Sequence, residues 1–454
     1  MIIIPSLPED VSNKEFLSKA NVVMRFFSNI PGNLIEKFIS AKHRVYFERK
    51  TVRFLCKHFG EAHPVPDHLT VEDKEIGGTP CRLYIPNKET RKSDGALFLV
   101  HGGAWLYNRA KYYDETCFDL ATQIGCMIIS IDYRRAPEVT FPVPVNDCWS
   151  AVEGFATQIY KEYGIDKNLL GVIGDSAGGN LAAVMALRDN VRKTNYLKCQ
   201  ILLYPATSCI DVDSPAFHEC RAIYKNSVLL QPKQGTRAVL LYLGLPATKR
   251  NIRKVMSNAC TTMEVRNHPD YIKNFDMNLL PEDILNSRHY IPNVQPSPDP
   301  EFAEIFSKAA FQPEFAPLFC SDEEMKGMCN AMVVSVQYDV LRDESILYAK
   351  KMERLEVGVE WKHYEKGYHG IFTIKGCELH DQVFGDVVQY VKKQFGMVQI
   401  EEEEKTDSLK QFADVVLRET SIETYKEDPR NNDSGFEDGT SSISSSDCQR
   451  TIKA

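Results

Sequence analysis

Leu169 to Ala183 reads Leu-Leu-Gly-Val-Ile-Gly-Asp-Ser-Ala-Gly-Gly-Asn-Leu-Ala-Ala, an apolar run followed by Gly-x-Ser-x-Gly and then by small helix-forming residues. This order predicts a buried strand, a sharp turn and a helix. Glycine at 174 and 178 lets the helix begin close to the strand, because a Cβ at either position would crowd the two elements. Such a turn holds its central residue in strained backbone geometry and exposes the side chain. We therefore interpret Ser176 as a candidate nucleophile; the alternative is a tight turn without chemistry.

The segments around this stretch alternate between strand and helix patterns. Residues 96–100 form a continuous apolar run, typical of a buried parallel strand. Further strands are expected over 126–133, 200–204, 331–337 and 359–364. Helices are expected over 147–163 and 345–355, a loop over 141–146, and a hairpin over 70–86 that turns at Thr79-Pro80. The alternation predicts an α/β fold, with a mostly parallel central sheet and helices on both faces.

Bulk composition excludes several classes of protein. The chain has 454 residues, 43% of them hydrophobic, which is enough for one large α/β domain with additions. A net charge of −8 argues against nucleic acid as a partner. The thirteen cysteines form no Cys-x-x-Cys pair, so neither a zinc site nor a dense disulfide framework is indicated, and we expect no cofactor. No apolar segment reaches the length of about 18–20 residues that a membrane span requires.

The N-terminal region differs from the rest in charge. Residues 12–60 carry ten Lys/Arg and three Glu, with apolar residues at helical spacing. Pro31-Gly32 predicts a break between two amphipathic helices. Such helices either pack on the main domain as part of a cap or lie on a membrane surface, and the two roles are compatible. We assign residues 1–70 to this region and count a membrane surface among the expected partners.

The strand predicted at 96–100 runs directly into His101-Gly102-Gly103-Ala104. Glycines at the end of a strand let backbone N–H groups face an approaching carbonyl oxygen, so this segment is a candidate second source of oxyanion donors. The helix behind Ser176 points its positive end at the same place. The alternative is an ordinary glycine turn.

Regular alternation lapses between residues 206 and 328, where the chain contains proline-rich and acidic pieces. A long insertion between two strands of a sheet usually covers the active site. We interpret 206–328, together with the N-terminal helices, as a cap that lines an apolar pocket within a main domain of residues 71–397. The alternative is an insertion remote from the site.

Two further groups follow the strands at 331–337 and 359–364. Asp339 comes directly after the first, and His369 follows the second, so the chain order is Ser176, Asp339, His369. This order suits a triad whose side chains converge at the carboxyl ends of the strands, with His369 as the base and Asp339 orienting it. Asp343 competes for the orienting role, but it lies where a helix begins, and we favour Asp339.

Five motifs together resemble the hormone-sensitive-lipase-like branch of the α/β-hydrolases. They are His101-Gly102-Gly103, Asp132-Tyr133-Arg134 with Ala136-Pro137-Glu138, Gly174-Asp175-Ser176-Ala177-Gly178-Gly179, Tyr338-Asp339-x-Leu341-Arg342-Asp343 and His369-Gly370. Within that branch the chain is most similar to the arylacetamide deacetylases and neutral cholesterol ester hydrolases, over residues 5–397. The resemblance implies a triad of Ser176, Asp339 and His369, with oxyanion donors at Gly102, Gly103, Ala104 and Ala177.

Two features depart from that family. Ala104 stands where a third glycine is usual, which retains the N–H but restricts the backbone and the space for acyl groups. Related members also begin with a membrane anchor that places them in the endoplasmic reticulum, whereas this chain begins about where such an anchor would end. The resemblance implies association with that membrane; the sequence as given, with no signal or spanning segment, implies the cytoplasm.

The last segment, 398–454, is rich in Glu, Ser, Asp and Gly and is expected to be disordered, with a transient helix at 409–420.

Two function classes remain for the chain as a whole. The first is a serine esterase or lipase-like hydrolase that cleaves esters or acyl amides of small, uncharged, apolar substrates through an acyl-enzyme. The second is a catalytically silent ligand-binding protein on the same fold. Loss of a triad residue is the usual mark of the second class, and none is lost here.

Overall fold

A central sheet of eight strands organises the molecule, of which the computed structural model describes residues 7–59, 64–209, 212–224, 227–291 and 299–397. The strand order is β1-β2-β4-β3-β5-β6-β7-β8; β2 pairs antiparallel with β1 and with β4, and the other neighbours pair in parallel. The predicted α/β fold is therefore confirmed. The strands are β1 (Leu69–Ile76), β2 (Thr79–Pro86), β3 (Ala96–Val100), β4 (Met127–Ile131), β5 (Leu170–Asp175), β6 (Leu197–Leu203), β7 (Asn330–Tyr338) and β8 (Val359–Tyr368).

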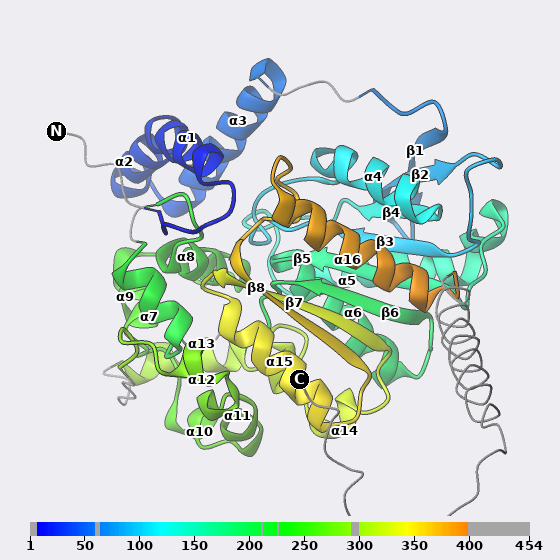
Figure 1. The fold of residues 1–454 in the computed structure, drawn as a ribbon. Coiled ribbons are helices and arrows are strands. Elements are labelled where there is room, and N and C mark those ends of the chain that lie inside the picture. The colour runs from blue at the N-terminus through cyan, green and yellow to red at the C-terminus, as the bar shows by residue number, and fades with distance from the viewer. Residues whose placement is uncertain (1–6, 60–63, 210–211, 225–226, 292–298, 398–454) are drawn as a thin grey trace, which may run out of the picture. The chain divides into compact units, whose positions relative to one another are not determined.

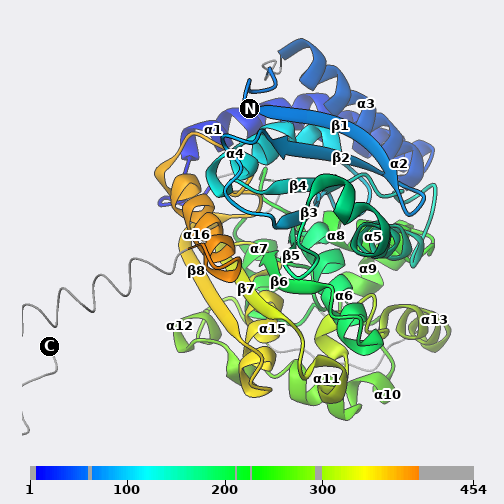
Figure 2. The same ribbon diagram turned by 90° about the vertical axis from the view of Figure 1, so that its right-hand side faces the viewer.

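Helices cover both faces of this sheet (Figure 1 and Figure 2). One face packs against α4 (Asp114–Ile124) and α16 (Glu378–Gln394), and the other against α5 (Val143–Gly154), α6 (Ala177–Arg192) and α15 (Arg342–Arg354). Successive side chains of β3 alternate between the two cores, with Leu97 in one and Phe98 in the other. Because both faces are covered, the central parallel strands β3, β4 and β5 are buried along their whole length, whereas the edge strand β8 carries charged residues and is only partly buried.

The insertion between β6 and β7 folds into short helices, which Figure 1 shows in green below and beside α8. Polar N-caps begin several of them: the side chains of Ser214, Thr248 and Asp299 each accept a hydrogen bond from a backbone N–H in the first turn. The helices are α7 (Pro215–Ala222), α8 (Pro232–Tyr242), α9 (Lys249–Met256), α10 (Met263–Arg266), α11 (Pro269–Asn274), α12 (Glu282–Leu285), α13 (Pro300–Ala310) and α14 (Asp322–Met325).

The N-terminal helices do not break at Pro31-Gly32, and that prediction is wrong. α1 (Lys14–Met24), a π-helical turn over Arg25–Asn29 and α2 (Ile30–Phe38) follow one another without a gap. Proline is tolerated in the first turn of a helix, where its missing N–H is not required. The chain turns instead after α2, before α3 (Ala41–Phe59).

Two other elements differ from their predicted bounds. The β1–β2 hairpin turns at Gly77-Gly78, where φ is +57° and +80°, and not at Thr79-Pro80, which begins β2. Positive φ at both central residues is the geometry that a two-residue hairpin turn requires. α5 begins at Val143, inside the predicted loop, because Pro144 lies in its first turn. The helix predicted over 147–163 is α5 followed by a π-helical turn and a 3₁₀ turn.

None of the helices in the described ranges is long and apolar enough to cross a membrane. The expectations for 398–454, including the helix at 409–420, fall on residues outside the described part of the chain.

The approach of α6 to β3 generates a prediction about two glycines. A Cβ on Gly178 would lie 2.0 Å from the carbonyl oxygen of Val100, whereas a Cβ on Gly385 in α16 would meet no atom within 4 Å. We expect Gly178→Ala to lower the free energy of unfolding by about 3 kcal/mol through overpacking. Gly385→Ala should raise it by about 0.5–1 kcal/mol, because alanine favours the helix. Urea denaturation measures both; equal effects would contradict the close approach at Gly178.

Candidate functional site

Ser176 lies in the turn between β5 and α6, with φ +58° and ψ −121°. This is a left-handed conformation that a residue with a side chain adopts only under constraint from its surroundings. The Ser176 N–H donates to the carbonyl oxygen of Leu203, at 2.9 Å, and so ties the turn to the end of β6. The strand, turn and helix predicted around this serine are present.

Three side chains that are far apart in the sequence form one hydrogen-bonded series. His369 Nε2 lies 2.9 Å from the Oγ of Ser176, and His369 Nδ1 lies 2.7 Å from Oδ2 of Asp339. All three follow the carboxyl ends of parallel strands, which is why they meet at one edge of the sheet. The other oxygen of Asp339 accepts from the N–H of Leu341 at 3.0 Å, so that the carboxylate is oriented from both sides.

The electrostatic setting of His369 favours a proton on the ring. Burial by itself lowers the pKa of His369, but the charge of Asp339 and its hydrogen bond raise it, and the resulting pKa lies above the ordinary value. With Asp339 bound to Nδ1–H, Nε2 of the neutral ring can accept the hydrogen of the Ser176 hydroxyl.

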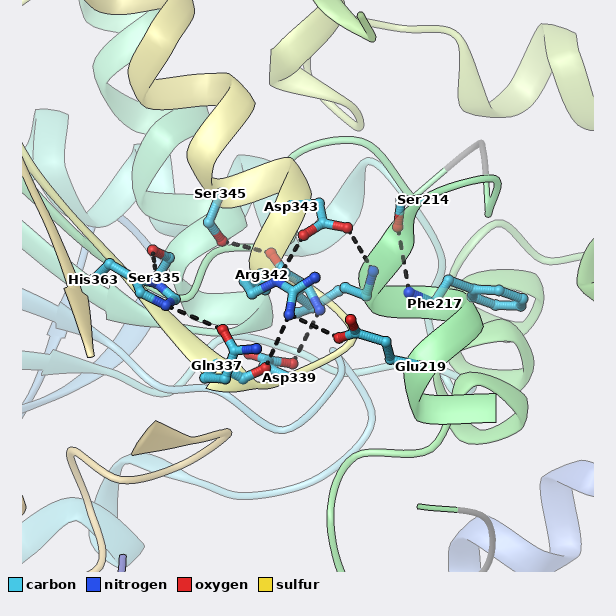
Figure 3. Close-up of polar contacts among 12 residues, drawn as sticks. Ser214, Phe217, Glu219, Ser335, Gln337, Asp339, Arg342, Asp343, Ser345 and His363 are labelled. Carbon is cyan, nitrogen blue, oxygen red and sulfur yellow. Dashed lines mark hydrogen bonds and ion pairs between the residues drawn. The ribbon is translucent and has the colours of Figure 1, made fainter. Parts of the chain in front are cut away.

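Asp343 points away from His369 and into a different network. Its carboxylate accepts from Nε of Arg342 at 2.8 Å and from the N–H of Ala216 at 2.6 Å. Figure 3 shows the guanidinium of Arg342 between Asp343 and Glu219, and Glu219 lies 2.8 Å from it. Asp343 therefore fastens the start of α7 to the start of α15, while Asp339 contacts the histidine.

The four N–H groups predicted as oxyanion donors divide into two kinds. The N–H of Gly102 donates to Oδ1 of Asp175 at 2.8 Å and lies 3.0 Å from the hydroxyl of Tyr113. It is therefore engaged within the protein, and the prediction for Gly102 requires revision. No group of the described residues accepts a hydrogen bond from the N–H of Gly103, Ala104 or Ala177.

Ala104 adopts a backbone conformation that glycine would enter more easily. Its φ is +56°, and the flanking Gly103 and Trp105 have φ of +108° and +57°. Left-handed geometry at two consecutive residues with side chains costs free energy, which the surrounding structure has to offset.

A cavity lined mainly by apolar side chains opens beside Ser176. The cap helices α7, α8 and α9 contribute much of its wall, together with the turn around Ala104 and the start of α15. Apart from Glu344, no side chain that lines it in the described part of the chain carries a formal charge. Its large apolar lining residues are Trp105, Val212, Phe217, Leu230, Val239, Val255, Phe275, Val340 and Leu341.

Glu344 occupies the one acidic position in that wall. Its carboxylate accepts from the N–H groups of Thr207, Ser208 and Cys209, at 3.0, 3.2 and 3.1 Å. Burial raises the pKa of Glu344 to about 8, against the lowering effect of these three hydrogen bonds. The carboxylate thereby holds the loop after β6 against α15 and is turned toward backbone rather than toward the cavity's contents.

Sequence reasoning missed the supporting groups of this site. Asp175 lies inside the quoted Gly-Asp-Ser motif, but nothing in the sequence indicated that its carboxylate would engage Gly102. No sequence pattern indicated the roles of Tyr113 and Glu344. Tyr113 contacts Gly102, 11 residues away, and Glu344 contacts backbone groups 135–137 residues away. Within the described ranges, no group of His, Cys, Asp and Glu is arranged to hold a metal ion.

Comparison with known proteins identifies the fold family. A family model described as an alpha/beta hydrolase fold matches residues 97–270 and 301–373. Arylacetamide deacetylase of Bos taurus is 32% identical to this chain, with the match covering 70% of this chain and 79% of the relative. Neutral cholesterol ester hydrolase 1 of Rattus norvegicus is 29% identical, covering 81% and 89%. The solved structure of a hyperthermophilic esterase from Pyrobaculum calidifontis shares the fold, with a TM-score of 0.55 at 23% identity over 84% of this chain and 96% of the esterase.

The two aspartates generate a prediction that needs no knowledge of a substrate. A fluorophosphonate probe labels an activated serine, so we expect labelling of Ser176 to accelerate as His369 deprotonates, with a midpoint above the ordinary histidine pKa of about 6.5. Asp339→Asn should lower that midpoint, because the charge that raises the pKa is gone, and should slow labelling about 10⁴-fold. Mass spectrometry of the labelled peptide measures the rate.

Asp343→Asn is the matched comparison. It should keep the midpoint and instead lower the free energy of unfolding by about 2 kcal/mol, since Arg342 and Ala216 lose a charged acceptor. The reverse pattern in the two variants would exchange the roles of the aspartates, and equal labelling of Ser176→Ala would remove the serine assignment.

Proposed function

This chain belongs to the α/β-hydrolase family, and on that premise we propose that it is a serine carboxylic ester hydrolase acting on uncharged, apolar esters and acyl amides. The single observation that supports this most strongly is the hydrogen-bonded series Ser176–His369–Asp339 beside an apolar cavity.

Acylation follows from the positions of these atoms. As Ser176 Oγ attacks the substrate carbonyl, its proton passes to Nε2 of His369, and Asp339 stabilises the imidazolium that forms. The carbonyl oxygen gains negative charge, and the N–H groups of Gly103, Ala104 and Ala177 are the donors available to bind it. Gly102 is left out of this set, because its N–H supports the loop through Asp175. His369 then protonates the leaving alcohol or amine.

Deacylation uses the same groups with water in place of the alcohol. His369 accepts a proton from the water as it attacks the acyl-serine, and returns it to Ser176 Oγ when the carboxylic acid leaves. Each half-reaction begins and ends with neutral His369, so the pH dependence of both should reflect one histidine.

The wall of the cavity indicates the substrate class. Its apolar side chains favour acyl or alcohol groups without charge, and no cationic side chain in the described part of the chain lines the cavity to pair with an anionic substrate. The names of the relatives are consistent with this, since one is a deacetylase and another a cholesterol ester hydrolase.

Substrate profiling tests this proposal. We expect turnover of uncharged p-nitrophenyl esters of short to medium chain, abolished in Ser176→Ala, and little turnover of esters that bear a carboxylate. Ala104→Gly should widen acceptance of bulky acyl groups more than it changes turnover of acetate esters, because φ of +56° is unstrained for glycine. No activity toward any ester or acyl amide in folded protein would favour a silent ligand-binding protein, and activity confined to charged substrates would contradict the assignment of the cavity.

We also propose that the enzyme meets its substrates at a lipid surface, through α1 and α2. The buried side of these helices carries Leu17, Asn21, Ser28 and Gly32, which are small or polar apart from the leucine. The exposed side is the more apolar one, an inversion of the usual pattern in which apolar side chains face the core. It presents Phe16, Val23, Phe26, Phe27, Ile30, Leu34 and Phe38, with exposures from 41% to 72%.

Charge on these helices is complementary to an anionic membrane. Lys14, Lys19 and Lys37 of α1 and α2 are exposed, and so are Lys42, Lys50 and Arg53 of the following helix, α3. The side chains of Glu36 and Glu48 are only 7% and 10% exposed, so burial removes two of the three acidic groups of 12–60 from the surface. Exposed aromatic side chains beside lysines are what an interfacial helix presents to lipid headgroups.

Vesicle flotation measures this association. We expect the double variant Phe26→Ser/Phe27→Ser to bind vesicles of phosphatidylcholine and phosphatidylserine at least tenfold more weakly, since burying each phenylalanine contributes about 1.5–3 kcal/mol. Ile272→Ser/Ile305→Ser removes two comparably exposed side chains from the cap and should leave binding unchanged. Equal loss in both variants would contradict the assignment of the lipid-facing side.

A further inference from the structure

Two neighbouring residues of α3, Glu48 and Arg49, form hydrogen bonds to the turn that follows Gly103 and Ala104. The N–H groups of Gly103 and Ala104 are two of the three available oxyanion donors. The hydroxyl of Tyr107 donates to Oε2 of Glu48 at 2.5 Å. Nε of Arg49 donates to the carbonyl oxygen of Leu106 at 2.6 Å. Consecutive residues of one helix therefore hold consecutive residues of the turn that follows Gly103 and Ala104.

This turn is closed and strained. The carbonyl oxygen of Gly103 accepts from the N–H groups of both Leu106 and Tyr107, at 3.0 and 2.8 Å, so a displacement of Tyr107 pulls on the peptide group between Gly103 and Ala104. Ala104 and Trp105 both have positive φ. Left-handed geometry at residues with side chains persists only where neighbouring contacts define it, and the α3 contacts are of that kind.

Glu48 is itself fixed in a buried cluster of charges. Its other carboxylate oxygen accepts from Nε of Arg44 at 2.8 Å. Arg44 also binds Glu36 of α2, at 2.9 Å, and Glu36 binds Arg237 of α8, at 2.8 Å. Side chains in this cluster are at most 10% exposed, and buried charges are held in place by their partners because exposure of either alone is costly.

The close approach of α2 and α3 supports the same arrangement. A Cβ on Gly32 would lie 3.2 Å from both Arg44 Nε and Glu48 Oε1, so a glycine at this position leaves room for the pair. Glu48 is thus a fixed point to which the hydroxyl of Tyr107 is anchored. Figure 1 shows α1–α3 beside α8, the helix that supplies Arg237 to the cluster and several side chains to the cavity.

We propose that Tyr107, anchored by Glu48, is a positioning residue that holds the Gly103 and Ala104 N–H groups where the substrate oxygen becomes negatively charged. The inference rests on the proposed hydrolase function, and it assigns to the N-terminal helices a role in the rate of reaction in addition to any role at lipid. Because the oxyanion exists only in the transition state, misplaced donors should lower kcat and leave substrate binding unchanged.

Tyr107→Phe removes the hydroxyl and keeps the ring. Tyr163→Phe is the matched control, since the hydroxyl of Tyr163 also donates to a glutamate, Glu72 at 3.0 Å, on β1 at the edge of the sheet away from this turn. We expect kcat for a p-nitrophenyl ester to fall about tenfold in Tyr107→Phe, with KM within twofold of the wild type. The affinity for a trifluoromethyl ketone, which forms a tetrahedral oxyanion on Ser176, should fall by the same factor, while Tyr163→Phe leaves all three quantities unchanged.

Arg49→Met removes the donor to Leu106, together with the donors to Ala136 and Glu138, while retaining an unbranched side chain, and we expect the same separation of kcat from KM. Unchanged kcat in Tyr107→Phe, or kcat and KM that change together, would overturn the proposal. Absence of ester hydrolysis in the wild-type protein would instead refute the proposed function. In that case amide hydrogen exchange decides the inference separately: Tyr107→Phe should accelerate exchange in a peptide spanning residues 102–108 relative to Tyr163→Phe, and equal exchange would overturn it.

Discussion

The contact between the start of α6 and the end of β3 is the constraint on which the site depends. There is no room for a Cβ at Gly178 beside the carbonyl oxygen of Val100, nor at Gly174 beside the carbonyl oxygen of Gly178. This close approach forces Ser176 into left-handed geometry and places the amino end of α6 behind it. The same approach brings the serine close to the segment after β3, and Ser176 and Ala104 both line one cavity. The backbone geometry of Ser176 thus follows from a steric requirement of the packing between α6 and β3.

The run Asp339 to Glu344 connects this site to the cap. Asp339 contacts His369, Asp343 and Arg342 bind the start of α7, and Glu344 binds the loop after β6. The six consecutive residues 339–344 therefore contact His369, the helix α7 and the loop after β6. Arg342 and Asp343 lie only three and four positions after Asp339, yet they bind α7 and not His369. Neighbouring side chains in the first turn of α15 point in different directions.

The N-terminal helices invert the usual distribution of polarity. Their charged side chains Glu36, Arg44 and Glu48 are buried against α8 and Tyr107, and their phenylalanines face outward. A buried charge network is weak evidence for stability, since desolvation offsets most of the Coulombic attraction, but it specifies one arrangement of the helices. The N-terminal helices contact both the turn that follows Gly103 and the helix α8 that lines the cavity, so a single defined arrangement of these helices matters for both.

The amino-acid sequence by itself determined the features that depend on local pattern. Apolar runs indicated the parallel strands, Gly-x-Ser-x-Gly indicated the turn at Ser176, and the order of Ser176, Asp339 and His369 indicated which side chains would converge. The strand predictions succeed because a parallel strand buried on both faces is apolar along its length. The order of the three residues is informative because the carboxyl ends of parallel strands share one edge of the sheet. Boundaries failed where proline or glycine could serve either of two roles, as at Pro31 and Thr79-Pro80.

Only the tertiary structure decided which polar groups are partners. Gly102 could not be distinguished from Gly103 in the sequence, yet its N–H is engaged by Asp175, 73 residues away. Asp339 and Asp343 lie four residues apart, and their different roles follow from what packs against each. Glu36 and Glu48 are ordinary charges of an amphipathic region in the sequence, but in the structure Glu36 is buried against Arg237 of α8 and Glu48 is buried against Arg44 and Tyr107. A hydrogen bond is selected by geometry within about 3 Å, and that proximity arises from packing between elements distant in the chain rather than from the residues adjacent to the donor or acceptor.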